Sequence, residues 1–104
     1  MTWIVEYYVN ARGESPVKKL LLEQDPRVKA KVMDAIEIST KSGPFLKPPY
    51  MKRLLPNLYE LRIKSTVVVR VFYSPIAGIY YLIHAFVKKI QKTPEKELKI
   101  ALVL

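Results

Sequence analysis

Three strand-like segments follow one another in the second half of the chain, and this arrangement most constrains the fold. The segments are Leu58–Lys64, Val67–Tyr73 and Ile79–Lys88. In the first two segments successive side chains fall on opposite faces, and one of the two faces carries the charged residues. The third segment is apolar on both faces until His84 and Lys88, which is typical of a central strand. Because short loops join antiparallel neighbours, the sequence predicts an antiparallel sheet.

The remaining segments predict helices and one more strand. Trp3 to Val9 is suited to a first strand, and Ser15-Pro16 and Asp25-Pro26 each place a capping side chain before a proline, the pattern that starts a helix. We expect the second helix to end near Ser42 and residues 44–57, which contain four prolines, to be mostly irregular. Thr93-Pro94-Glu95 predicts the start of a final helix. The expected order is β-α-α-β-β-β-α, an α+β fold in a single domain over residues 1–104, with a mostly antiparallel sheet and helices packed on one face.

The register of the first hairpin follows from its apolar pattern. A two-residue turn at Ser65-Thr66 would bring the apolar face of one strand against the polar face of the next. A three-residue loop, Ser65 to Val67, instead pairs Arg62 with Arg70. This places two like charges directly opposite each other, which is unfavourable unless solvent or an anion lies between them. The arginine pair therefore predicts a site of positive charge. The second hairpin loop is expected to run from Ser74 to Gly78.

The excess of positive charge lies in the C-terminal part of the chain. The net charge is +9. Residues 1–40 contain as many acidic as basic residues, so the whole excess lies in residues 41–104. Lys88, Lys89 and Lys92 lie just before the predicted helix start at Thr93, and a helix N-terminus itself attracts anions. This segregation favours a nucleic-acid partner, RNA in particular, over an acidic protein or a membrane surface.

Several classes of protein are disfavoured by what the sequence lacks. The chain has no cysteine, which excludes disulfides, thiolate metal sites and a cysteine nucleophile. It has one histidine, no spacing typical of metal ligands, no glycine-rich phosphate loop and no nucleophile-elbow motif. From these absences we expect a protein that uses no metal and no other cofactor. No signal peptide or membrane-spanning segment is apparent, so we also expect the protein to be soluble and cytoplasmic.

The remaining polar residues fit cleavage of RNA, whose 2′-hydroxyl can itself act as the nucleophile. Arg62 and Arg70 are candidates to hold the phosphate oxygens. A lysine surrounded by other cations has a lowered pKa and can exchange protons, so Lys88, Lys89 and Lys92 are further catalytic candidates. The candidate RNA-binding residues are Lys52, Arg53, Lys64, His84 and Thr93.

Each candidate also has an ordinary structural explanation. Arg62 and Arg70 are also consistent with solvent-facing strand residues, and the lysine cluster with a solubilising strand end. His84 fits equally a partly buried, hydrogen-bonded histidine, and Thr93 is a helix cap whatever else it does. The tyrosines of these strands are more typical of a core than of a base-stacking surface.

Three segments together resemble a known family. They are Leu58-Tyr59-Glu60-Leu61-Arg62, then Val69-Arg70-Val71-Phe72-Tyr73, then His84 through the lysine cluster to Thr93-Pro94. They resemble the phage-derived branch of the RelE/ParE superfamily, the RelE/HigB-type toxins of type II toxin–antitoxin systems. The resemblance implies a small RelE-like fold and a metal-independent endoribonuclease, an mRNA interferase that inhibits translation by cutting ribosome-bound mRNA.

The resemblance also implies partners and leaves alternatives. Arg62 and Arg70 match the strand arginines of the family, and Lys88, Lys89 and Lys92 match its basic C-terminal motif. The implied partners are a cognate helix-turn-helix antitoxin, mRNA and the ribosome, with no membrane. The tyrosine that some of these toxins carry near the C-terminus has no counterpart after Tyr81, so the general base stays open. The alternatives are a non-catalytic basic module that binds nucleic acid or an antitoxin, and a gyrase-targeting ParE-like toxin.

Overall fold

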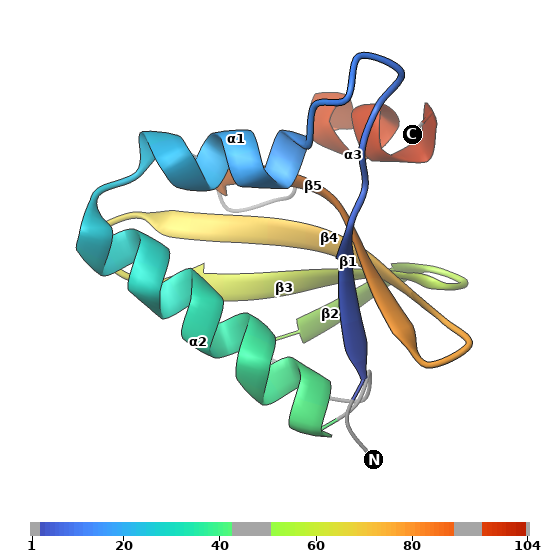
Figure 1. The fold of residues 1–104 in the computed structure, drawn as a ribbon, viewed down its shortest axis with the longest axis horizontal. Helices are drawn as coiled ribbons and strands as arrows, with labels where there is room; N and C mark the ends of the chain where they lie inside the picture. The colour runs from blue at the N-terminus through green and yellow to red at the C-terminus, as the bar shows by residue number, and fades with distance from the viewer. Residues whose placement is uncertain (1–2, 43–50, 89–94, 104) are drawn as a thin grey trace.

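The fold is a five-stranded sheet with helices on both of its faces (Figure 1). The computed structural model describes residues 3–42, 51–88 and 95–103. Its elements are β1 (Ile4–Tyr7), α1 (Pro16–Glu23), α2 (Pro26–Ser42), β2 (Met51–Leu55), β3 (Leu58–Lys64), β4 (Val68–Ile76), β5 (Ile79–Lys88) and α3 (Glu95–Val103). The α+β class and the mostly antiparallel sheet predicted from the sequence are confirmed.

The strands lie in the order β1-β5-β4-β3-β2. Strands β2 to β5 pair antiparallel, each with the next along the chain, whereas β1 pairs parallel with β5. A parallel partner needs a long crossover, and here α1, α2 and three further strands lie between the two in sequence. The strand β5 is therefore an interior strand, and its residues belong to apolar clusters on both faces of the sheet, which explains its apolar character on both faces.

The two N-terminal helices begin where the capping residues predict. The Ser15 hydroxyl oxygen accepts a hydrogen bond from the backbone N–H of Lys18 (3.3 Å), and Pro16 is the first residue of α1. The Asp25 carboxylate accepts from the backbone N–H groups of Arg27 and Val28 at 2.9 and 3.1 Å. Each cap satisfies donors that the first turn leaves unpaired, so the chain forms two helices with a break at Asp25.

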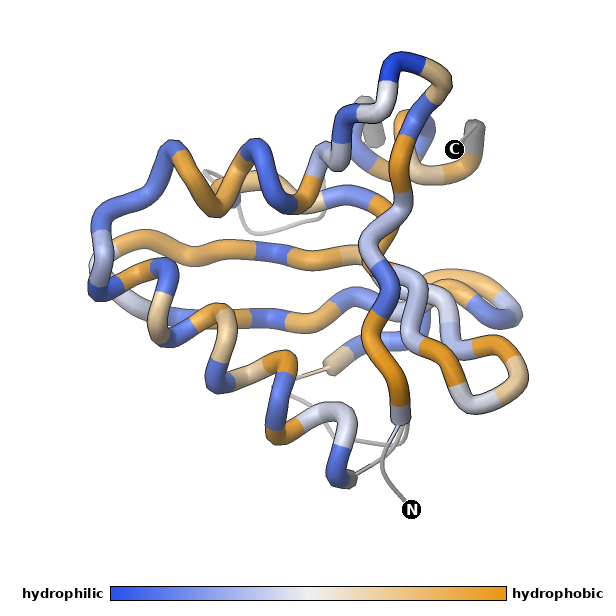
Figure 2. The backbone as a smooth tube through the Cα atoms, in the orientation of Figure 1, coloured by the Kyte–Doolittle hydropathy of each residue, from blue (hydrophilic) through white to orange (hydrophobic). Residues whose placement is uncertain are grey.

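Helices α1 and α2 cover one face of the sheet and build the main core. Val17, Val28 and Val32 from these helices are almost fully buried against Val69 and Val71 of β4. Along both helices the backbone alternates between hydrophilic and hydrophobic residues (Figure 2), as expected for helices with one buried side. The core therefore takes the odd-numbered side chains of β3 and the first half of β4, and leaves the even-numbered ones on the opposite face.

Helix α3 packs on that opposite face, so the expectation that all helices share one face was wrong. Leu98 and Ala101 of α3 contact a second apolar cluster with Leu58, Phe72 and Phe86. Phe72 lies between Val71 and Tyr73 in β4, and strand alternation points it away from the main core. The two phenylalanine rings meet edge to face with centroids 5.5 Å apart and give α3 an apolar surface to cover.

Two further expectations need correction. Residues 51–55, expected to be irregular, form β2, an edge strand paired with β3. The second hairpin loop is shorter than predicted, because β4 continues to Ile76 and only Ala77 and Gly78 form the turn. Both turn residues have positive φ, 50° and 81°, as a tight two-residue hairpin requires. No helix in the described ranges is long and apolar enough to span a bilayer.

Candidate functional site

The pairing of β3 with β4 builds a charged cluster on the face opposite the main core. Arg62 lies directly opposite Arg70 in the ladder, and Ile63 opposite Val69. The loop between the strands is closed by a hydrogen bond from the Ser65 N–H to the Val67 carbonyl oxygen (2.8 Å). The three-residue loop and the arginine pair predicted from the sequence are both confirmed.

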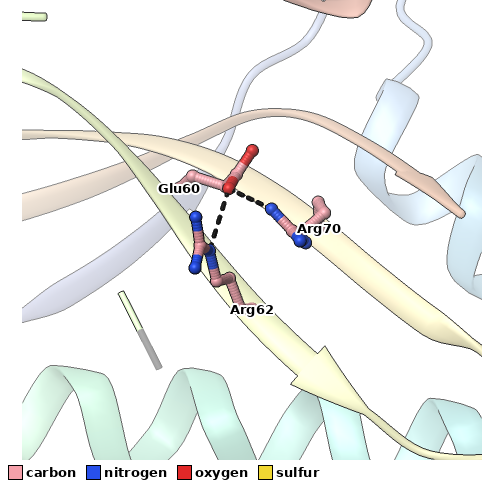
Figure 3. Close-up of polar contacts among 3 residues, drawn as sticks. All are labelled: Glu60, Arg62 and Arg70. Carbon is pink, nitrogen blue, oxygen red and sulfur yellow. Dashed lines mark hydrogen bonds and ion pairs between the residues drawn. The ribbon is translucent and has the colours of Figure 1, made fainter. Parts of the chain in front are cut away.

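Glu60 resolves the repulsion between the two arginines. Its carboxylate oxygen Oε1 accepts a hydrogen bond from Nε of Arg62 (3.2 Å) and another from Nη1 of Arg70. Figure 3 shows both guanidinium groups turned toward this one carboxylate. One negative charge between two positive charges makes each contact attractive, so the like-charged pair does not depend on solvent for its stability.

Burial differs sharply among these three side chains. The Glu60 side chain is 0% exposed, that of Arg70 7% and that of Arg62 27%. A buried carboxylate without a partner is strongly unfavourable, so the contact with the nearly buried Arg70 stabilises Glu60 at this position. Nε of Arg70 is buried and has no hydrogen-bond partner among the described residues. Arg62 is thus the member of the cluster that solvent or a ligand reaches most easily.

Strand register places other predicted residues on the same face. Residues that pair across neighbouring strands form a row on one face of the sheet. Lys52 pairs with Glu60 and so lies on its face. Lys64 pairs with Val68, and Val68 pairs with Lys88. Lys88 therefore ends a row that begins at Lys64, next to the arginine row. Four strands contribute to this surface, which we call the basic face: Lys52, Glu60, Arg62, Lys64, Arg70 and Lys88.

The environment lowers the pKa of Lys88 from its ordinary value. Burial is the largest cause, and the neighbouring charge of Arg70 acts in the same direction. Glu60 opposes the shift, whereas Arg62 and Lys52 add to it. A lysine with a lowered pKa holds a larger fraction of neutral amine at physiological pH, and so can both accept and donate protons.

His84 lies on the same side of the sheet but already has a protein partner. Its Nε2 is 2.6 Å from a carboxylate oxygen of Glu97 in α3, and its ring lies near Phe72 and Phe86. This contact joins β5 to α3, and the half-buried, hydrogen-bonded arrangement matches the structural explanation weighed from the sequence. Nδ1 of His84 is buried and has no hydrogen-bond partner among the described residues.

The structure separates one predicted residue from the others and does not describe three. Arg53 pairs with Tyr59, whose ring packs against the main core, so Arg53 lies on the other side of the sheet from the basic face. Lys89, Lys92 and Thr93 lie outside the described residues, and their roles stay predictions. Within the described ranges, no group of three or more His, Asp or Glu side chains is placed to hold a metal ion.

Glu60 is the component of the site that the sequence reasoning did not select. From the sequence it is named only as part of the segment Leu58-Tyr59-Glu60-Leu61-Arg62, without a role of its own. The available signal was its position, two residues before Arg62 and therefore on the same side of β3. What the arrangement can do chemically is bind an anion: several cations share one face, and one buried carboxylate neutralises only part of their charge.

Comparison with known proteins identifies the family. Residues 19–104 match the family described as Phage derived protein Gp49-like (DUF891). The matched region includes the whole basic face, and no curated protein matches the chain. The chain belongs to the Phage derived protein Gp49-like family, a toxin-like family related to the RelE/HigB-type toxins.

Proposed function

We propose that this protein is the toxin of a type II toxin–antitoxin module and that it cleaves RNA at the basic face. The observation that carries the proposal is the placement of Arg62, Arg70 and Lys88 on one side of the sheet, with the pKa of Lys88 lowered by its surroundings. Membership of a toxin-like family supports the same conclusion. It also favours a cognate antitoxin as partner, with ribosome-bound mRNA as the substrate.

The proposed reaction uses the substrate's own 2′-hydroxyl. Its oxygen attacks the adjacent phosphorus, the bond from phosphorus to the 5′-oxygen breaks, and the products carry a 2′,3′-cyclic phosphate and a 5′-hydroxyl. A neutral lysine amine accepts the 2′-hydroxyl proton, and a protonated group returns a proton to the departing 5′-oxygen. Lys88, Lys89 and Lys92 remain the candidates for these transfers, and Lys88 is the one that the structure describes.

The arginines supply the electrostatic part of the reaction. Negative charge increases on the phosphate oxygens as the new bond forms, and a guanidinium donates two hydrogen bonds in a fixed plane. A donor held in place before the reaction needs no reorganisation as the charge develops. Positive charge for this role comes from the chain itself, so the reaction we propose needs no metal ion.

Replacing Arg62 with alanine tests the proposal. Because Arg62 is the more exposed arginine, we expect Arg62→Ala to fold and to lower RNA cleavage by about 100-fold or more, the usual effect of losing one preorganised donor. Arg27→Ala, which removes an exposed arginine of α2, is the matched control and should cleave like the wild type. The assay follows cleavage of a defined mRNA, with and without ribosomes. If Arg62→Ala retains wild-type cleavage, the assignment fails.

One observation favours a second function, a non-catalytic binding module. Arg70 is 7% exposed and bonded to Glu60, as a purely structural arginine would be. Such a module would bind nucleic acid with an affinity that falls gradually as charges are removed, and its salt dependence would scale with their number. RNA that is bound but never cut would support this function. DNA damage signalling with intact mRNA would instead indicate a gyrase-targeting toxin.

A further inference from the structure

Glu60 is an unusual residue to find in a face that binds anions. A carboxylate repels phosphate, so a surface that only had to attract RNA would be better without it. Glu60 is nevertheless fully buried and lies between the two arginines of the proposed site. Its contacts must therefore contribute something that outweighs this repulsion.

The geometry shows what that contribution is. Both arginine contacts converge on one oxygen, Oε1, from two neighbouring strands. An arginine side chain has many rotamers, and fixing it costs conformational entropy unless a partner holds it. Arg62 uses Nε for Glu60, which leaves the two terminal nitrogens of its fork outside this contact. The carboxylate thus restrains the guanidinium planes while leaving donors for a ligand.

We propose that Glu60 is a positioning residue, whose carboxylate holds the guanidinium groups of Arg62 and Arg70 so that their remaining donors meet an RNA phosphate. This inference rests on the proposed function. The role is indirect, because Glu60 acts through the arginines and does not itself contact the substrate. It resembles the outer partners of other preorganised sites, which fix the orientation of the groups that do the chemistry.

Glu60 also influences the lysine of the basic face. Among the described charged residues that shift the pKa of Lys88, Glu60 is the one that raises it. Removing the Glu60 charge would therefore lower the pKa of Lys88 further. The described charges that would still lower the pKa of Lys88 are those of Arg70, Arg62 and Lys52, and Lys64 lies on the same row of the ladder.

The test compares two substitutions that separate geometry from charge. Glu60→Gln keeps the shape and removes the charge, whereas Glu60→Asp keeps the charge and withdraws the carboxylate by one methylene. The matched control is Glu37→Gln, which removes a glutamate from an exposed pair with Lys41 on α2. Circular dichroism and thermal unfolding establish that each variant is folded, and Glu60→Asp remains informative if Glu60→Gln does not fold.

The first readout is independent of RNA cleavage. The Nε–Hε proton of Arg62 donates to Glu60, so in ¹⁵N-labelled wild type it should exchange slowly with solvent. In Glu60→Gln a neutral amide oxygen replaces the charged acceptor, and this weaker hydrogen bond should speed the exchange by about fivefold. Unchanged exchange in a folded variant would overturn the inference, whether or not the protein is a ribonuclease.

The second readout is the kinetics of RNA cleavage. Misplacing the arginines should lower kcat by about 10- to 100-fold with KM changed by less than about threefold, because the lost contacts matter most in the transition state. In a plot of kcat against pH, the rise that we assign to loss of a proton from Lys88 should move to lower pH in Glu60→Gln. It should stay in place in Glu60→Asp. This shift reports the charge of Glu60 at Lys88 whatever else Glu60 does, so kcat decides the role: wild-type kcat in folded Glu60→Asp would overturn positioning. If the wild type cuts no RNA, the proposed function fails and the exchange measurement alone decides the role of Glu60.

Discussion

Breaking the contact between Glu60 and Arg70 should destabilise the fold far more than breaking an exposed ion pair. We consider Arg70→Met, which keeps an extended side chain and removes the charge. Since the Glu60 side chain is 0% exposed and that of Arg70 7%, the variant leaves a buried carboxylate with one fewer partner. Loss of one member of a buried pair costs about 3–5 kcal/mol. Arg62 still donates to Glu60 at 3.2 Å, so we expect the lower end, about 3 kcal/mol.

This cost is a large share of the stability of a domain of this size. A total of about 5–15 kcal/mol is usual, and a loss of about 3 kcal/mol lowers Tm by on the order of 15 °C. The double variant Glu60→Gln with Arg70→Met removes both charges. Its loss in free energy of unfolding should be about 2 kcal/mol smaller than the sum of the losses of the two single variants. Glu37→Gln, whose partner Lys41 is exposed, should lose less than about 1 kcal/mol.

Urea unfolding followed by circular dichroism and by Trp3 fluorescence measures these values. The slope with urea should be the same for all variants, so that the midpoints report stability alone. A loss below about 1 kcal/mol in Arg70→Met, or strict additivity in the double variant, would refute the reasoning. Either result would mean that the buried contact contributes little. Activities of Arg70 variants are interpretable only with the folded fraction measured alongside.

Three further predictions follow from other parts of the molecule. Phe72→Ala should cost about 3–5 kcal/mol in urea unfolding, because the ring is fully buried beneath α3. Ala77→Gly should raise the free energy of unfolding by about 0.5–1 kcal/mol, since Ala77 has a φ of 50°; an unchanged midpoint would contradict this. Burial raises the pKa of Tyr73 and of Tyr80 above the ordinary value. The unfolded state therefore ionises first, so stability should be intact below about pH 10 and lost at higher pH, with a smaller loss in Tyr73→Phe; Tm measured from pH 8 to 11 checks this.

Features set by local chemistry could be predicted from the sequence. Ser15 and Asp25 cap helices because their side chains reach backbone N–H groups two or three residues ahead, and no distant contact is needed. The register that pairs Arg62 with Arg70 follows from the loop length and the apolar pattern of two adjacent strands. Both kinds of information lie within a few residues of the feature that they determine.

Features set by contacts between distant parts of the chain could not be predicted from the sequence. Strand β2 lies at an edge of the sheet and depends on pairing with β3, and the prolines around it hid the strand pattern. To predict that α3 packs on the second face, one would have had to recognise that Phe72 and Phe86 form a second apolar cluster on that face. Parallel pairing of β1 with β5 joins the first strand of the sheet to the last strand in sequence, with Ile4 opposite Ile79.

The candidate site shows the same division. Alternation along β3 and β4 was enough to predict that Arg62 and Arg70 share a face. Burial of Glu60 depends on what covers the strand, so the sequence did not distinguish it from a solvent-facing residue. The roles of Lys89, Lys92 and Thr93, which lie outside the described residues, stay predictions.

Cleavage of an RNA carrying a single 2′-deoxy nucleotide tests the central claim most directly. The cut site is first mapped on an unmodified transcript, and the nucleotide on its 5′ side is then replaced by its deoxy counterpart. The account predicts 2′,3′-cyclic phosphate ends on the unmodified RNA, no cleavage at the deoxy position, and slow cleavage of the unmodified RNA by Arg62→Ala. Equal cleavage of the deoxy RNA at that position by the wild type would contradict it.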